Sequence, residues 1–456
     1  MISGSQSELI DARNPTESYP RTDHPDSLMG AILAIEGIRD AVVVLNGPTG
    51  CKVFYGWLSD QQYPRADHLS IARDFREFFF GQSRIPCTYL DEQDYVFGAS
   101  EKLARILPAV AGSGEHALIA IVNSPGAALI GDDLQRFLRG AKPAVATMAP
   151  TIATETPGFS EDMAAGFQRA LQGAMETLAP PLAAPWRPAR PRTINLLGLS
   201  IYHQHWQGSL VHLTEFLRLM GIEVLAAPGA GSSVAEIERI AEAECNIVIH
   251  QEYADTLAPW IESRYGTPSL FPSAGAPVGF DATEEWLREV AGALSLDPAP
   301  ALSRVREDRG IAFAHLNRFQ RHTGLPKGAA FALAADASVA APLLRWLHGY
   351  LGMAPTGVRI DSGAGTPLAA GVHEYLSEAG CPDAWEADLA TDFPDLVLAS
   401  GVEVARLVGG SQARAGIGIA QPAGARIDVV PKALLGSRGS LFLLEWILDA
   451  LHEHLV

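Results

Sequence analysis

Six short runs of apolar residues are spread along the chain. They are AVVVLNGPTG (41–50), ALIAIVNSPG (117–126), TINLLGLSIY (193–202), NIVIHQ (246–251), AAFALAADA (329–337) and PDLVLASG (394–401). Each run is rich in Val, Ile, Leu and Ala and lacks polar alternation, as expected for strands that are buried on both faces of a parallel sheet. Amphipathic stretches with helical spacing follow the runs. The pattern predicts an α/β fold of doubly wound layers with parallel sheets.

Two breaks divide this series of strands and helices. The sequence APPLAAPWRPARPR (179–192) holds five prolines, which exclude a helix and a central strand. A second break, GLPKG, lies at 324–328. We therefore predict three α/β domains, at 1–180, 190–325 and 326–456, and this number suits a chain of 456 residues. Ligands in such domains bind at the carboxyl ends of the strands.

The charge balance narrows the classes of partner. The chain has 34 Lys and Arg against 52 Asp and Glu, a formal net charge of -18. A nucleic-acid partner is not expected, because phosphate binding needs a basic surface. No apolar run reaches the roughly 18 residues of a membrane span, and the polar N-terminus lacks the apolar core of a signal peptide. We expect a cytoplasmic protein that does not enter a membrane.

The turn LNGPTGCKVFYG (45–56) raises the first question of chemistry. It is no phosphate-binding loop, because Val53 stands where the GxxxxGK[ST] pattern needs Ser or Thr. What remains is Cys51, after a strand and at or near a helix N-terminus. That position lowers a thiol pKa and favours the thiolate that binds metals. The alternative is a small buried residue at a strand end.

Five further motifs point to a family. They are GPTGC (47–51), DEQDYVFGASEKL (91–103), IGDDL (130–134), HWQGSLVHLTEFLRLMGIEV (205–224) and LLGSRGSLFLLEWILDAL (434–451). With these motifs in this order, the chain resembles the component 1 subunits of nitrogenase and nitrogenase-like reductases. The resemblance implies three Rossmann-like domains. It also implies an iron–sulfur cluster, either 4Fe–4S or a larger P-cluster-like one, that is shared at a subunit interface.

In that family, three cysteines from three loops of each subunit hold the cluster. Cys51 matches the middle one. The first falls at Asp26: a carboxylate can ligate iron, and a relative that reduces protochlorophyllide uses an aspartate there, but Asp26 could equally be a helix N-cap. The third falls at Pro125, which cannot ligate. Cys87 is the candidate to compensate, with a buried inert thiol as the alternative. We interpret Cys245 and Cys381 as structural.

His250 occupies the position of a cysteine that anchors a larger metal cofactor in the catalytic nitrogenase subunit. It is therefore a candidate for a substrate or cofactor pocket, although a histidine at a strand end is more often simply hydrogen-bonded. This departure indicates a β-type subunit without that cofactor, or a relative that binds substrate in the cavity.

The resemblance also implies partners and a reaction. A separate ATP-dependent iron protein would deliver electrons. A related component 1 subunit would complete a heterodimer or heterotetramer, with a homodimer as the alternative. The first expectation for the substrate is the carbon–sulfur bond of a methylthio-alkane. The alternatives are a tetrapyrrole reductase subunit, a scaffold for metal-cluster assembly, and an α/β ligand-binding protein without metal.

Overall fold

The computed structural model describes residues 26–60, 85–113, 116–145, 149–156, 158, 161–179, 190–422, 430 and 432–453. These residues form three sheets, and every strand pair in them is parallel. The predicted α/β fold is thereby confirmed. Most of the predicted proline-rich linker, 180–189, lies outside the described residues. The domain boundaries themselves stay a prediction.

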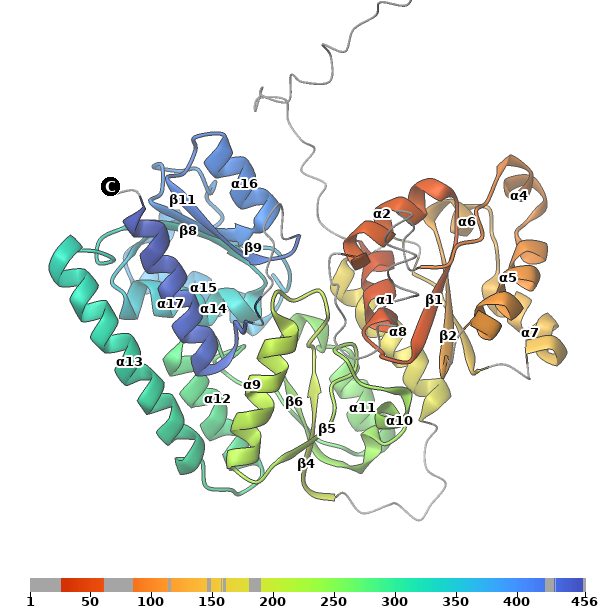
Figure 1. Cartoon of the computed structure of the whole chain (residues 1–456), viewed down its shortest axis with the longest axis horizontal. Helices are drawn as coiled ribbons and strands as arrows, with labels where there is room; N and C mark the ends of the chain where they lie inside the picture. The colour runs from red at the N-terminus through yellow and green to blue at the C-terminus, as the bar shows by residue number, and fades with distance from the viewer. Residues whose placement is uncertain are drawn as a thin grey trace, which may run out of the picture.

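Each sheet lies within one of the three predicted stretches of chain (Figure 1). The first has the order β1 (Ala41–Asn46), β2 (Leu118–Asn123), β3 (Thr151–Thr154). The second has the order β5 (Glu223–Ala226), β4 (Arg190–Leu197), β6 (Ala243–Val248), β7 (Ser269–Leu270). The third has the order β11 (Ala415–Ala420), β10 (Leu396–Ser400), β8 (Ala330–Ala335), β9 (Ala354–Ile360).

The helices cover both faces of the sheets. In the N-terminal part they are α1 (Ser27–Glu36), α2 (Thr49–Asp60), α4 (Glu92–Phe97), α5 (Ser100–Ser113), α6 (Pro125–Leu129), α7 (Leu134–Val145) and α8 (Met163–Leu178). In the middle part they are α9 (Trp206–Leu219), α10 (Val234–Ile237), α11 (Leu257–Tyr265), α12 (Phe280–Ala293) and α13 (Ala299–Thr323). The C-terminal part has α14 (Ala337–Leu344), α15 (Pro367–Glu378), α16 (Gly401–Gly409) and α17 (Gly436–His452). In these described ranges, no helix has the length and apolar character to cross a membrane.

The middle sheet shares an apolar core with each of its neighbours. Leu196 and Ile247 face a core that continues into the C-terminal sheet and α17. On the other face, Leu197 and Val248 join a core that includes α1 and α8 of the N-terminal part. This alternation follows from the period of two along a strand. It explains why the apolar runs are continuous, since both faces of the strands are buried.

Two of the family motifs meet at the start of α9. The Ser209 hydroxyl accepts hydrogen bonds from the backbone N–H groups of Leu434 (3.0 Å) and Leu435 (3.3 Å). A Cβ at Gly208 would lie 1.9 Å from the carbonyl oxygen of Lys432. The motif HWQGS therefore holds the turn that begins α17, and both motifs have a structural role.

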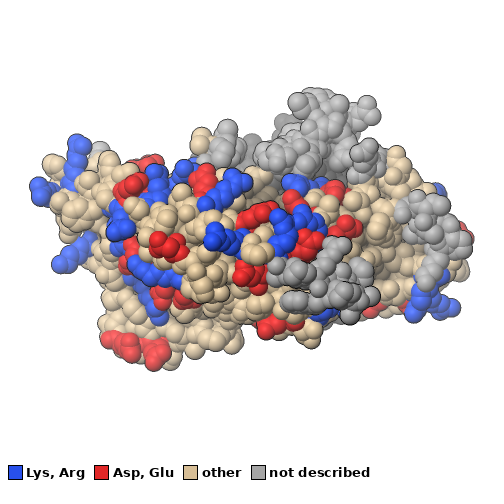
Figure 2. Space-filling model, turned by 90° about the horizontal axis from the view of Figure 1, so that it is seen from below, with Lys and Arg blue, Asp and Glu red and all other residues tan. Residues whose placement is uncertain are grey.

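The surface carries charges of both signs. On the face shown in Figure 2, Lys and Arg side chains are interspersed with Asp and Glu. Ion pairs of this kind occur on α12 and α13, where Arg309 contacts Asp281 (2.6 Å) and Glu284 (3.0 Å). Exposed pairs like these contribute little to stability. They do cancel one another's fields, so the face in Figure 2 presents no large region of a single sign.

Helices α1 and α8 approach each other closely at their first turns. A Cβ at Gly30 would lie 1.9 Å from the Met163 carbonyl oxygen, and a Cβ at Gly166 would lie 1.8 Å from the Ser27 carbonyl oxygen. Only glycine permits this contact between backbones. The crossing brings the N-cap of α1, Asp26, beside Asp162, the N-cap of α8, and a β-bridge joins the two residues.

We predict that Gly166→Ala destabilises the protein by about 1–3 kcal/mol, because the added methyl group forces the two backbones apart. Gly173 lies in the same helix, and a Cβ added there would have no atom within 4 Å. Gly173→Ala is the matched control, and it should stabilise the protein by about 0.5–1 kcal/mol. Urea unfolding measures both variants. Equal effects of the two substitutions would contradict the role given to the crossing.

Candidate functional site

An amide network joins the strand ends of the N-terminal sheet. Asn46 ends β1 and Asn123 ends β2, and the Asn46 Nδ2 donates to Asn123 Oδ1 (2.9 Å) and to Asp132 Oδ2 (3.3 Å). The Thr88 hydroxyl donates to Asn46 Oδ1 at 2.9 Å. Asn123 Nδ2 also donates to the Asp132 carbonyl at 2.7 Å. The network thereby fixes three segments relative to one another: the loop after β1, the loop after β2, and the segment around Thr88.

Cys87 lies on the segment that pairs with the end of β1. The backbone of Cys87 forms a parallel β-bridge with Leu45, and the residue is 1% exposed. The thiol donates to the Gly47 carbonyl at 3.0 Å, and the Tyr89 N–H points to the sulfur at 3.5 Å. Burial raises the pKa of the Cys87 thiol, although backbone hydrogen bonds and Lys52 act in the opposite direction.

Cys51 lies in the first turn of α2 and is half-buried. Burial raises the pKa of its thiol, and the nearby Cys87 and Asp26 raise it further. The position near the helix N-terminus had predicted a lowered pKa, so that expectation is wrong: burial and negative neighbours outweigh the helix dipole here. A hydrogen bond with the Ser124 side chain acts in the lowering direction. The sequence analysis missed Ser124, which directly precedes Pro125.

Asp26 caps α1. Its Oδ1 accepts from the Met29 N–H (2.9 Å), and its Oδ2 accepts from the Tyr55 hydroxyl (2.7 Å). Tyr55 comes from α2, so this bond ties Asp26 to the helix that carries Cys51. The N-cap role is therefore present, and it leaves lone pairs on the carboxylate for a cation.

Pro125 opens α6 after the N-cap Ser124, so this strand end supplies no thiolate. The candidate donors are the Cys51 thiol and two neighbours that raise its pKa, the Cys87 thiol and the Asp26 carboxylate. Within the part of the chain that the structure describes, no group of three or more His, Cys, Asp or Glu side chains is placed so that it could hold a metal ion. The donor set suits iron in its chemistry, but it suits only part of a site.

Exposed apolar side chains are concentrated on the helices and loops next to this donor set. Among the described residues, thirteen large apolar side chains are exposed, and seven of them lie on α2, α4, α6 or the adjoining loops. We name these seven the apolar rim: Val53, Phe54, Tyr89, Val96, Phe97, Leu129 and Ile130. Figure 1 shows α2, α6 and α4 along one end of the N-terminal part. Such a concentration is typical of a protein–protein contact.

Two lysines hold the loop between Cys87 and α4. The Lys52 ammonium bonds the Tyr89 hydroxyl at 2.6 Å. The Lys102 ammonium bonds the Tyr89 carbonyl at 2.9 Å and also pairs with Asp91 and Asp94. Tyr89 needs this support because its backbone is left-handed, with a φ of 52°. The motif DEQDYVFGASEKL thus positions the loop beside Cys87.

His250 belongs to a different polar cluster, where the middle and C-terminal sheets meet. Its Nδ1 lies 2.9 Å from the Ser338 hydroxyl, which donates to Glu252 Oε1 at 2.6 Å. The ring stacks on His203, with centroids 3.8 Å apart. His250 and Glu252 are only 2% and 3% exposed. Burial lowers the pKa of His250 to about 3 and raises the pKa of Glu252 to about 7.

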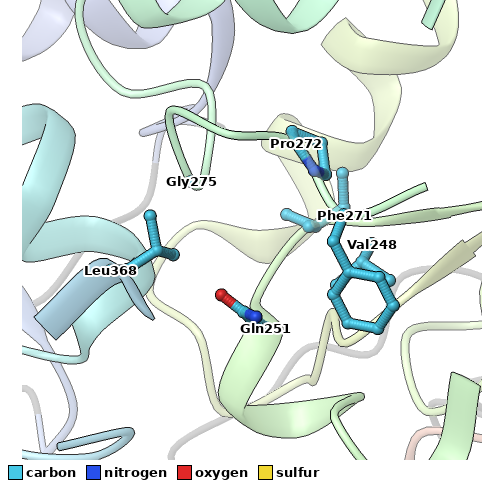
Figure 3. A pocket seen from close by; sticks show the side chains of 7 residues that line it. Val248, Gln251, Phe271, Pro272, Gly275 and Leu368 are labelled. Atoms are coloured by element: carbon cyan, nitrogen blue, oxygen red, sulfur yellow. The ribbon is translucent and has the colours of Figure 1, made fainter. Parts of the chain in front are cut away.

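A small hollow lies next to this cluster. Its lining residues are Val248, Ile249, Gln251, Phe271, Pro272, Gly275 and Leu368, and the space between them is about 170 Å³. Figure 3 shows Leu368 on one side, Phe271 and Pro272 on the other, and Gln251 between them. Cofactor and substrate pockets usually measure roughly 300–1,000 Å³. The hollow beside His250 is too small to enclose a large planar ligand.

Comparisons with known proteins give the chain its relatives. A family model for nitrogenase component 1 type oxidoreductases matches residues 27–452. The B subunit of the light-independent protochlorophyllide reductase of Rhodospirillum rubrum is 31% identical over 185 residues, which are 39% of this chain and 33% of that protein. The nitrogenase molybdenum-iron protein alpha chain of Methanothermobacter marburgensis is 30% identical over 255 residues, which are 55% of this chain and 52% of that protein.

A solved structure of nitrogenase Cp1 at pH 6.5 superposes with a TM-score of 0.76 and 16% sequence identity, over 95% of this chain and 93% of that chain. This likeness shows the same fold. The matched stretches span about a third to a half of the length of these two curated relatives.

The raised pKa of Glu252 predicts a pH dependence of stability. Its pKa is about 7 in the folded protein against an ordinary 4.5. Between these values the folded protein holds a proton that the unfolded chain has lost. This contribution to stability is complete below pH 4.5 and disappears as the pH rises through 7. The urea midpoint of the wild type should therefore fall relative to that of Glu252→Gln over this range.

Glu262→Gln, on the exposed face of α11, is the control and should show no such change. A constant difference between the wild type and Glu252→Gln over this pH range would contradict the assignment.

Proposed function

The chain belongs to the nitrogenase component 1 type oxidoreductases, and from this membership we propose that it is one subunit of a nitrogenase-like reductase. In this proposal it pairs with a related subunit and shares an iron–sulfur cluster with it at their interface. It receives electrons through that cluster from an ATP-dependent iron protein. Its substrate is a tetrapyrrole, reduced at a double bond of the ring.

The observation that carries the proposal is the incomplete donor set beneath the apolar rim. The Cys87 thiol and the Asp26 carboxylate, which come from two other segments, both raise the pKa of the Cys51 thiol. Iron–sulfur clusters take about four protein ligands or more, so this set needs donors from another chain. The apolar rim lies on α2, which carries Cys51, and on α4, α6 and the adjoining loops, and it offers the surface on which that chain would pack. Ligands and interface thus support each other.

The surrounding residues suit a negatively charged group. Burial raises the pKa of the Cys51 thiol and of the Cys87 thiol, and a bound cation would reverse this and release the protons. The Tyr89 N–H and the Lys52 ammonium both favour negative charge on the Cys87 sulfur. An iron–sulfur cluster held here would supply one-electron transfer.

The curated relatives bear on the choice of substrate. The two named above are a protochlorophyllide reductase subunit and a nitrogenase subunit. They favour the tetrapyrrole alternative over the methylthio-alkane that the sequence analysis placed first. The hollow of about 170 Å³ beside His250 is too small for a macrocycle. In this proposal the substrate site lies between subunits and not in that hollow.

We predict that Cys51→Ala loses most of the iron and sulfide of the anaerobically purified complex, because it removes the thiol at the centre of the donor set. ATP-dependent reduction of protochlorophyllide, with an added iron protein, should be lost together with the iron. Cys381→Ala removes another half-buried thiol, far from the donor set in the sequence, and is the matched control.

Unchanged iron in Cys51→Ala would refute the cluster assignment. A complex that keeps its iron but reduces neither protochlorophyllide nor a methylthio-alkane would instead favour the scaffold for cluster assembly.

We further predict that Phe97→Asp weakens subunit association by about tenfold or more, because it places a charge in the apolar rim. Phe97 is 85% exposed, so the fold of the single chain should survive. Phe313→Asp is the control, since Phe313 is 61% exposed on α13, outside the apolar rim. Light scattering after gel filtration should show the Phe97 variant shifting towards 48.6 kDa, the mass of one chain. An unchanged complex would exclude the rim as the interface.

A further inference from the structure

The polar cluster around His250 joins three segments that are distant in the sequence. His203 follows β4, His250 and Glu252 follow β6, and Ser338 follows β8. Hydrogen bonds link His250 Nδ1 to the Ser338 hydroxyl (2.9 Å) and the Ser338 hydroxyl to Glu252 Oε1 (2.6 Å). The three linked side chains are at most 3% exposed. An imidazole, a hydroxyl and a carboxyl group therefore form a chain inside the protein.

The same heavy-atom positions allow two arrangements of protons. With Glu252 ionised, His250 Nδ1–H donates to the Ser338 oxygen, and the Ser338 hydroxyl donates to the carboxylate. With Glu252 protonated, the carboxyl O–H donates to the Ser338 oxygen, and the Ser338 hydroxyl donates to His250 Nδ1. The imidazole N–H then sits on Nε2. His250 stays neutral in both arrangements, and the two differ by one proton.

We propose that His250, Ser338 and Glu252 are a proton relay, in which a proton taken up at His250 Nε2 appears on the Glu252 carboxyl. The balance is simple. One proton binds at Nε2, the Nδ1 proton moves to the Ser338 oxygen, and the Ser338 proton moves to Glu252. No electron is transferred. The reverse sequence returns the proton.

The surroundings allow Glu252 to change its charge. Its Oε2 is buried with no partner among the described residues, so no fixed cation holds the carboxylate. The Glu252 carbonyl accepts from Gln168 Nε2 at 3.0 Å, which fixes the backbone and leaves the carboxyl group free to titrate. The other titratable groups around the cluster, linked to it or to one another by their charges, are His203, Tyr202, Tyr253, Asp162, Asp255, Asp336 and Asp361.

Two of these groups, His203 and Asp336, lie beside the relay but are not part of it. His203 accepts from the Ser200 N–H at its Nδ1 (2.9 Å), so its own proton is on Nε2, and burial lowers its pKa. It therefore stays neutral beside His250. Asp336 has a raised pKa, with burial as the main cause and Glu252 as the next. A negative charge on Asp336 would oppose one on Glu252, which favours the protonated form of the relay.

Close backbone contacts hold the geometry of the relay. A Cβ at Gly198 would lie 2.2 Å from the His250 carbonyl oxygen, and a Cβ at Gly275 would lie 2.6 Å from the Ser338 carbonyl oxygen. A Cβ at Gly363 would lie 3.1 Å from the Glu252 Cβ. These contacts keep the hydrogen-bonding atoms in place while the protons move. The relay is argued from its hydrogen bonds and from these close contacts. Only its use in supplying protons to a reduction rests on the proposed function.

The test is the tautomer of His250, read from the ¹⁵N shifts of the full-length protein with labelled histidine, from about pH 5 to about pH 9. The spectrum of His250→Gln assigns its signals among those of the 13 histidines. We expect Nε2–H at low pH and Nδ1–H at high pH. The midpoint should coincide with that of the protonated carboxyl band of Glu252 in the infrared spectrum. A single tautomer over the whole range would overturn the relay.

Two variants separate the relay from simple neighbouring charges. In Glu252→Gln the His250 tautomer should no longer depend on pH. In Ser338→Ala the carboxyl band should still titrate while the tautomer stops following it. Glu262→Gln should behave as the wild type. A tautomer change that persists in Glu252→Gln would refute the relay. None of these measurements needs a cluster, a partner or turnover, so the relay can fail while the proposed function stands, and the reverse also holds.

Discussion

The crossing of α1 and α8 at a distance that only glycine allows is the constraint on which the candidate metal site depends. It fixes the N-terminus of α1, and with it the carboxylate of Asp26. The Tyr55 hydroxyl bonds that carboxylate, which sets the position of α2 and therefore of Cys51. Cys87 is positioned independently of this crossing, by backbone pairing with the end of β1. A contact between two backbones thus controls the positions of Asp26 and Cys51.

The buried strands could be predicted from the sequence because burial on both faces leaves continuous apolar runs. All six runs correspond to strands of the three sheets. The strands that the apolar pattern did not predict are short or lack such a run. For example, β7 has two residues, and in β11 (AGIGIA) apolar residues alternate with glycine. Their pairing depends on neighbours that are distant in the sequence. Local pattern is a poor guide to such strands.

The site was predictable in its residue types but not in its environment. Cys51 and Cys87 could be singled out from their positions at strand ends. The direction of the Cys51 pKa could not, because it depends on burial and on residues that only folding brings near. The bond between His250 and Ser338 spans 88 residues of sequence and follows no local motif. The two polar clusters also differ in burial, since Cys51 is half-buried and His250 and Glu252 are fully buried.

The hydrogen bonds between Ser209 of α9 and the turn before α17 have a consequence for the synthesis of the chain. Ser209 and its partner Leu434 are 225 residues apart. At about 5–20 residues per second, a ribosome needs roughly 11–45 s to make that stretch. During this interval the strands β6 and β7 and the helices α12 and α13 are made, and the apolar faces of α9, α12 and α13 still lack α17, the helix that packs against them. The protein must therefore pass through a long-lived nascent state with exposed apolar surface, and during this time chaperones have access to it.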